Sequence, residues 1–190
     1  MPGDNKDARR KGNMKCLAYI AAGIIAQTLI IVLFVLLVMR IRNPKVRLSS
    51  VAVENLGVNF SSSSPSFHMK LTALVTVKNT NFGHFKFSNN TATFSYRGIE
   101  VGEGTILQAR ARARSTKKLN VTVSVDSSKV SRKSLLHSDI NSGVLKLSSY
   151  AKLSGKIHLF KVVKKKKSAE MNCTMELNTK AKAIQNLACK

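Results

Sequence analysis

The chain has 190 residues, enough for one folded domain with appended segments. It carries 32 Lys and Arg against 9 Asp and Glu, a formal net charge of +23. This excess favours an acidic partner, such as nucleic acid, anionic lipid or acidic polysaccharide, without choosing among them. The 3 cysteines form no Cys-x-x-Cys pair and no two histidines have zinc spacing, which argues against a metal site.

The N-terminal part of the chain predicts a membrane anchor. Residues 1–15 are polar and basic, and we expect them to form a disordered cytosolic tail. Residues 17–39 (LAYIAAGIIAQTLIIVLFVLLVM) carry no charge, and a helix of this length spans roughly 35 Å, against about 30 Å for a hydrocarbon core. A cleaved signal peptide is the rival interpretation, but the run is long for one and no small-x-small cleavage site follows it. We therefore interpret the segment as an uncleaved signal anchor, of a length that suits the plasma membrane.

Charge does not decide the orientation of this span, because five basic residues precede it and four follow it. Two features favour an exterior C-terminal domain. One is a pair of late cysteines, Cys173 and Cys189, which would close a loop of about 15 residues; two unrelated thiols are the alternative. The other is a set of four Asn-x-Ser/Thr glycosylation sequons, at Asn59, Asn89, Asn120 and Asn172.

One further cysteine, Cys16, abuts the apolar segment beside Lys15. Cysteines next to a membrane are common sites of S-palmitoylation, so Cys16 is a candidate, with an unmodified thiol as the alternative. A basic linker with one proline, 40–48, leads from the span into the C-terminal domain, 49–190.

The C-terminal domain alternates apolar and polar residues with a period of two, which is typical of strands. The strongest of these runs is 67–79, where Phe67 and every second residue to Val77 share one apolar face. A turn is expected at 79–83 (NTNFG), with its asparagines and glycine in left-handed geometry. The alternation predicts strands over 46–58, 67–79, 84–98 with a turn at Asn89–Asn90, 99–108, 118–126, 143–160 and 169–180.

Two segments interrupt this pattern and a third follows it. Residues 127–142 lose the period and predict one short amphipathic turn or helix, closed by Gly143. Residues 161–168 (KVVKKKKS) are expected to form a basic turn, and the chain ends in a tail. Seven or eight short strands with little helix predict an all-β fold, an antiparallel β-sandwich preceded by one transmembrane helix.

The stretch ILQARARARSTKKL, 106–119, alternates Arg110, Arg112 and Arg114 with alanines, which places the arginines on one face of a strand. Charge on an outward face discourages pairing at a sheet edge, so a solvated edge strand is one interpretation. A basic stripe that contacts an acidic surface is the other. With this stripe we group the lysine run Lys164, Lys165, Lys166 and Lys167 as candidate basic contacts.

The sequence indicates no enzyme. It contains no nucleophile elbow, zinc-protease or P-loop motif, its four histidines are scattered, and Ser149 and Lys152 match Ser-x-x-Lys without the companion motifs. We therefore expect no catalytic residues, no cofactor and no metal. Nucleic-acid binding is disfavoured by the membrane span and by the lack of an aromatic-and-basic recognition motif.

The order of elements resembles a plant family. The basic tail, the single span, VKNTNFGHFKFSNNTATFSYRG (77–98), VGEGTI, KLNVTVSVD and the late cysteines resemble the membrane-anchored late embryogenesis abundant (LEA) proteins of the second subgroup, which carry the WHy domain and overlap the harpin-induced-like (NHL-type) family. Asn79-Thr80-Asn81 stands where the family usually has Asn-Pro-Asn, which removes a pre-set turn geometry.

The resemblance implies a fibronectin- or immunoglobulin-like sandwich and a plasma-membrane protein with a cytosolic N-terminus and an exterior domain. It also implies a role in defence or in stress such as dehydration, and no enzyme activity. Our leading hypothesis is a basic exterior domain that binds acidic wall polysaccharide or anionic lipid. A lipid-binding or lipid-transfer module is the alternative, and protein partners or self-association stay open.

Overall fold

The computed structural model describes residues 4–38, 40–159 and 163–190, and it divides the chain into two units that meet between Ile41 and Arg42. The first unit consists of helix α1, Asp4–Val38. Its stretch Cys16–Leu36 is long and apolar enough to cross a membrane, as a membrane anchor or a signal sequence would be. The expected span ends at Met39, which lies outside the described residues.

The segment we expected to be disordered is helical from Asp4 onward, so that prediction is wrong for residues 4–15. The segment contains Ala, Arg, Lys and Met, which favour helix, and the apolar helix that follows allows it to propagate without a new nucleation step.

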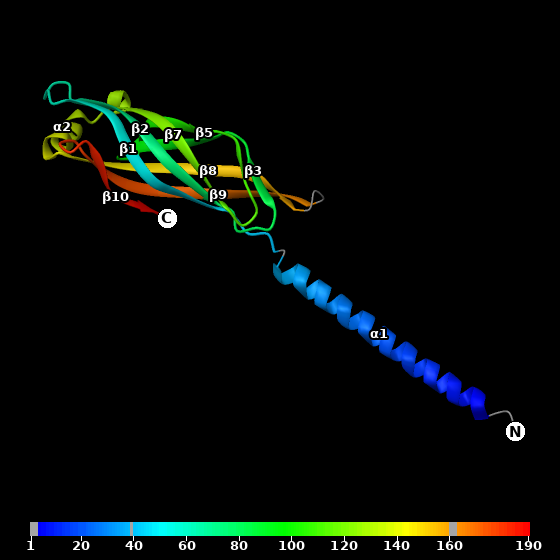
Figure 1. Cartoon of the computed structure of the whole chain (residues 1–190). Helices are drawn as coiled ribbons and strands as arrows, with labels where there is room; N and C mark the ends of the chain where they lie inside the picture. Colours follow the sequence, from blue (N-terminus) through cyan, green and yellow to red (C-terminus); the bar gives the residue numbers. More distant parts are fainter. Residues whose placement is uncertain (1–3, 39, 160–162) are drawn as a thin grey trace. The chain divides into compact units, whose positions relative to one another are not determined.

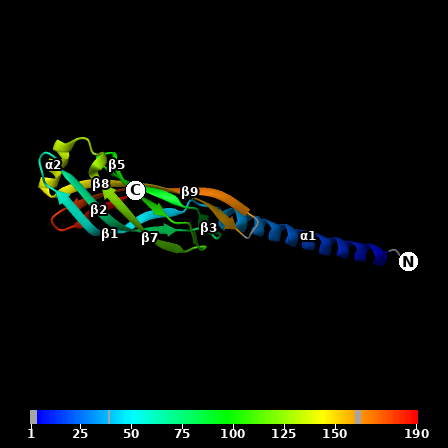
Figure 2. The ribbon, with the colours of Figure 1, turned by 90° about the horizontal axis from the view of Figure 1, so that it is seen from above.

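The second unit is a domain of antiparallel strands with one short α-helix and a 3-10 helix, η1 Ser127–Lys129. Figures 1 and 2 show how these elements are arranged. Helix α2, Lys133–Ser142, ends at Gly143, whose φ of 81° and N–H to the Ile140 carbonyl form the predicted cap. The strands are β1 Lys45–Asn59, β2 Ser66–Lys78, β3 His84–Phe87, β4 Asn90–Tyr96, β5 Ile99–Ile106, β6 Ala109–Ala111, β7 Thr116–Asp126, β8 Val144–Leu159, β9 Val163–Asn178 and β10 Ala183–Cys189.

The strands form one continuous sheet in the order β1-β2-β7-β5-β4-β8, after which β8 pairs with β9 on one side and with β3 further along. Strand β6 pairs with β3, and β10 pairs with β9. The sheet curves until β1 contacts β9 and β10, where the Cys189 sulfur lies 3.8 Å from the Leu48 carbonyl oxygen. The all-β fold with a preceding helix is confirmed, as a single sheet that is nearly barrel-shaped.

The core lies between the inward faces of this curved sheet. The face of β2 predicted to be apolar, from Phe67 to Val77, is buried at every second residue. The ring of Phe67 packs edge-on against Tyr96 of β4, with centroids 6.1 Å apart. In β7, Val121, Val123 and Val125 are buried as expected. Period-two alternation therefore assigned the inward face of the main strands.

The structure has ten strands in its described part, whereas the sequence predicted seven or eight. The tail after residue 180 is strand β10, and residues 45–48 of the expected linker already belong to β1. Lys164–Lys167 are not a turn: they lie in β9 and pair with β8. Lysine is a poor strand former, but a partner strand in register overrides that propensity.

The loop 79–83 is held by buried asparagines rather than by left-handed residues, since neither asparagine nor Gly83 has a positive φ. The Asn79 side-chain amide donates to the Gly83 carbonyl at 2.8 Å and to the Arg112 carbonyl at 2.9 Å. The Asn81 amide donates to the Arg42 carbonyl at 2.8 Å, and its oxygen accepts from the Arg42 N–H at 2.6 Å. Gly83 is required for space, because a Cβ there would lie 2.4 Å from the His158 carbonyl oxygen.

Candidate functional site

A row of four cations crosses the outer face of the sheet. Arg110 of β6 lies opposite Lys86 of β3, Lys86 lies opposite Lys156 of β8, and Lys156 lies opposite Lys166 of β9. All four side chains are exposed. We call these four residues the cation row. Its members come from segments far apart in the sequence, and only the strand register brings them together.

Within the described residues, no member of the cation row forms a salt bridge. The ion pairs found there use other cations, at Lys70, Arg97, Lys129 and Lys152. Like charges directly opposite on neighbouring strands destabilise a sheet, so an unpaired row of four works against folding. An anionic ligand laid across the row would relieve that repulsion.

A trough runs beside the cation row. It is part of an open depression of about 730 Å³ on the outer surface. On β8 and β9 the trough is formed by Ser154 and Ser168, which are directly opposite each other. Along β8, Ser154 lies between Lys156 of the cation row and Lys152, which pairs with Glu170 at 2.9 Å. Small polar side chains therefore lie between two lines of long charged ones. We call the residues Ser88, Gln108, Ser154 and Ser168 the serine trough.

Close packing of two strands underlies this surface at Gly155. A Cβ on Gly155 would lie 2.5 Å from the Lys86 carbonyl oxygen and 2.7 Å from the Phe85 ring. The missing side chain lets β3 approach β8, which sets Lys86 beside Lys156. The side-chain oxygen of Asn90 accepts from the Ser154 N–H at 3.0 Å and holds the β3–β4 turn against the same strand.

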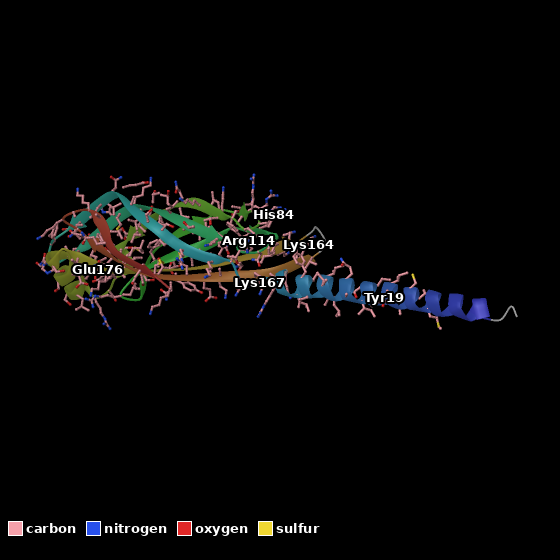
Figure 3. The ribbon with its side chains drawn as sticks, turned by 60° about the horizontal axis from the view of Figure 1, so that its bottom comes forward. Tyr19, His84, Arg114, Lys164, Lys167 and Glu176 are labelled. Atoms are coloured by element: carbon pink, nitrogen blue, oxygen red, sulfur yellow. A yellow bond between two sulfur atoms is a disulfide. The ribbon has the colours of Figure 1, made fainter. Side chains whose placement is uncertain are left out.

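Two histidines continue the basic face on the other side of the cation row. His84 lies opposite His158, and His158 lies opposite Lys164. Partial burial, followed by the nearby charges of Lys86 and Lys164, lowers the pKa of His158 below its ordinary value. This shift of the pKa favours the uncharged form of the ring. Figure 3 shows His84, Arg114, Lys164 and Lys167 at one end of the domain and Glu176 toward the other.

The three arginines of the opening stretch occupy different local structures. Strand β6 is only three residues long and is an edge strand paired with β3, which agrees with the edge interpretation. Arg110 belongs to the cation row. Arg112 follows the strand, and Arg114 lies in a turn with a left-handed φ of 53°. The Arg114 guanidinium lies 5.1 Å from the centre of the exposed Phe82 ring, a cation–π contact. All three are exposed, but only Arg110 is aligned with other cations.

The lysine run of β9 divides between the two faces of its strand. Lys164 and Lys166 lie opposite His158 and Lys156 and share their outer face. Lys165 and Lys167 alternate with them and fall on the other face. The four lysines are therefore not one patch, although Lys167 lines the depression beside Lys166.

The candidate modification sites are accessible. The sequon asparagines are all exposed, at the end of β1, in the β3–β4 turn, on β7 and on β9 (Asn59, Asn89, Asn120 and Asn172). Cys173 and Cys189 are joined in a disulfide that ties β10 to β9. Cys16 is exposed on α1 and forms no disulfide. Glycosylation and palmitoylation stay predictions.

Sequence reasoning missed most of the site. Lys86, Lys156, His158 and the serines of the trough were not singled out, because each is an isolated polar residue in an alternating strand. The signal available was only that a lysine and a histidine alternate with apolar residues in HFKFS (84–88) and in SGKIHLF (154–160). Ser149 and Lys152 do not form a catalytic pair, since Ser149 is buried and Lys152 is exposed on the opposite face of β8.

Comparison with known proteins agrees with the fold and the motifs. A family model described as late embryogenesis abundant protein (LEA_2) matches residues 74–175. A late embryogenesis abundant protein of Arabidopsis thaliana is 32% identical over 187 residues, which covers 93% of this chain and 83% of that protein. The chain belongs to the late embryogenesis abundant protein family. The matched region contains the asparagine loop, the cation row and most of the strands.

Solved structures are similar at a distance. A crystal structure of a protein from Archaeoglobus fulgidus shares 15% identity, covers 67% of this chain and 95% of that chain, and has a TM-score of 0.37. A solution structure from Arabidopsis thaliana shares 16% identity, covers 70% and 83%, and has a TM-score of 0.31. These scores add nothing to the assignment, which depends on the sequence family. Membership indicates a stress-related LEA-type protein, in a family that is generally non-enzymatic.

Proposed function

We propose that this LEA-family chain is a non-enzymatic, single-pass plasma-membrane protein that acts in dehydration stress or defence by binding an acidic partner through its basic β-domain. In this proposal it belongs to the second subgroup, with a WHy-type domain and NHL-type topology. The N-terminus is cytosolic and the β-domain is exterior. Support comes from the family, from the apolar helix and from the charge of the domain.

The observation that carries the binding proposal is the cation row. Four exposed cations on four neighbouring strands are aligned by register, and the described residues offer them no acidic partner. Such an arrangement lowers the stability of the sheet. An anion bound along the cation row would offset this cost, since each cation then gains a partner and the repulsion between the cations is removed.

The exterior placement has two supports. All four sequons are exposed on the β-domain, so an oligosaccharide could be attached at each without unfolding. The disulfide between Cys173 and Cys189 would persist in an oxidising compartment and would be reduced in the cytosol.

Orientation is tested by expressing the full chain in plant cells and measuring its gel mobility with and without a glycan-removing enzyme. A downward shift that disappears in a variant with all four sequon asparagines changed to Gln would support an exterior domain. Free thiols at both Cys173 and Cys189 together with an unshifted band would contradict it and would direct attention to the cytosolic leaflet.

Partner binding is tested on the full chain by charge reversal. Salt-sensitive binding of the wild type is first measured to isolated plant cell walls and to vesicles that contain phosphatidylserine. The variant K86E/K156E/K166E should lose binding to each of these that binds the wild type. The control K117E/K118E/K180E changes the net charge equally at exposed sites outside the cation row. Equal loss in the two variants, or loss in neither, would contradict the assignment of binding to this face.

The alternative of a lipid-binding module requires an apolar cavity. The depressions found among the described residues are open at the surface, and each includes polar or charged side chains. Support for the alternative would have to come from lipid that co-purifies with the protein.

A further inference from the structure

We infer that the cation row and the serine trough together form a binding site for a linear acidic polysaccharide, which lies across β6, β3, β8 and β9 with its anionic groups on the cation row. This inference rests on the proposed function and names the chemistry of the partner.

The length of the site suits an extended chain. Neighbouring strands lie about 4.8 Å apart, so four cations on four strands form a line of roughly 14 Å. A polymer with an anionic group on each repeat can place one group near each cation as it crosses the strands. A single small anion would engage only one or two of them.

The cross-section of the site suits a chain that is acidic on one edge and hydroxylated elsewhere. Ser154 and Ser168 present hydroxyl groups that both donate and accept hydrogen bonds, as sugar hydroxyls require. On the far side of the trough, the Lys152–Glu170 pair is neutral overall and offers further donors and acceptors. The α-carbons of Lys152 and Lys156 lie four residues apart on one strand, about 13 Å, which leaves the width of one chain between their side chains.

This shape distinguishes a polysaccharide from a membrane surface. A flat layer of headgroups reaches the tips of the long lysine side chains, whereas the serines lie below those tips. A site built only for a membrane has no use for a polar trough beside its cations. Filling the trough should therefore weaken polysaccharide binding and leave attraction to an anionic membrane unchanged.

The test uses the full chain in phosphatidylcholine nanodiscs and measures its affinity for oligogalacturonates of increasing length. Neutral dextran and phosphatidylserine vesicles are the comparison ligands. Three variants are measured: K86Q/K156Q removes the centre of the cation row, K117Q/K118Q removes the same charge elsewhere, and Ser154→Ile fills the trough with a side chain that strands accept. Thermal unfolding confirms that each variant folds.

We expect the wild type to bind oligogalacturonate in a salt-sensitive manner, with affinity that rises with length until the cation row is covered. K86Q/K156Q should bind about tenfold more weakly or worse, Ser154→Ile should bind clearly more weakly, and K117Q/K118Q should stay within about twofold of the wild type.

Three outcomes would overturn the inference, and they differ in what they leave of the proposed function. Binding of phosphatidylserine vesicles but not of oligogalacturonate, or oligogalacturonate binding that Ser154→Ile leaves unchanged, would replace the polysaccharide site with a simple anionic surface contact and leave the proposed function standing. Salt-sensitive binding to neither ligand would overturn the acidic partner, and the proposed function with it.

Discussion

Two charged regions of the β-domain are built in opposite ways. On α2, Asp139 accepts hydrogen bonds from the Tyr96 hydroxyl at 2.7 Å and from two nitrogens of Arg97 at 2.9 and 3.0 Å. Across β6, β3, β8 and β9, the cation row brings four like charges together with no such partner in the described residues. The first region satisfies its charges internally, and the second leaves its charges unpaired within the described residues.

The charges around Asp139 stabilise the domain, whereas the charges of the cation row have no such role in it. The chain has only 9 acidic residues, and within the described residues those that form ion pairs do so with cations outside the cation row. Loss of a partner in the first region should therefore destabilise the protein. Loss of charge in the second should stabilise it and weaken binding.

The largest effect is expected in the Asp139 cluster. Asp139→Ala should lower the free energy of unfolding by about 2 kcal/mol, because the buried Tyr96 hydroxyl loses its acceptor. The exposed Arg97 also loses its two-point contact, which adds little. Chemical denaturation measures the change. Glu170→Ala, which breaks the exposed pair with Lys152, is the matched control and should be nearly silent. Equal effects would remove the distinction between the two kinds of ion pair.

A smaller effect is expected at alkaline pH. Burial, together with the hydrogen bond to Asp139, raises the pKa of Tyr96 to about 12. The unfolded chain ionises this phenol near its ordinary pKa of 10, so the contribution is intact below pH 10 and is lost as pH rises toward 12. We expect the wild type to lose about 1 to 2 kcal/mol over that window through this group. Tyr96→Phe should have a correspondingly flatter profile, and parallel profiles would contradict the assignment.

The cation row should respond in the opposite direction. K86Q/K156Q should raise the melting temperature by about 1 to 3 °C at low salt, since it removes like charges that face each other across strands. The gain should shrink as salt is added, because salt screens exposed charges. K117Q/K118Q, which removes lysines opposite Val77 and Thr76, should give no such gain. A lower melting temperature for K86Q/K156Q would mean that the row stabilises the domain.

The smallest expected effect is the titration of His158, which NMR can follow. Burial and the flanking lysines hold its pKa below the ordinary value, and K86Q/K156Q should raise that pKa. Since folding favours the neutral ring, this group supports stability above its ordinary pKa and loses that contribution as pH falls. An unchanged pKa of His158 in K86Q/K156Q would show that the charges of Lys86 and Lys156 do not act on this histidine.

The sequence predicted the parts of the fold that depend on local pattern. Alternation identified the buried face of β2 from Phe67 to Val77, and the loss of alternation followed by Gly143 identified α2 and its cap. It failed where the deciding interaction is distant. Strand β10 has no clean alternation and exists because β9 and the disulfide hold it, and Lys164–Lys167 form a strand because β8 pairs with them.

The site was less accessible to sequence reasoning than the fold. Arg110 and Lys166 are 56 positions apart, and their alignment requires the registers of three strand pairs to be known at once. A run of like charges is easy to see in a sequence, as the lysines of β9 were, but strand geometry sends alternate members of such a run to opposite faces. The charges that act together here are scattered in the sequence and adjacent only in the sheet.

The most direct test of this account is the thermal unfolding of the full chain and of K86Q/K156Q at low salt, each with and without oligogalacturonate. A ligand that binds the folded state raises its melting temperature by mass action. We predict that the variant is more stable than the wild type without ligand and that only the wild type gains clearly when ligand is added. An equal gain in both proteins, or a variant less stable than the wild type in the absence of ligand, would contradict the claim that the cation row is kept for binding.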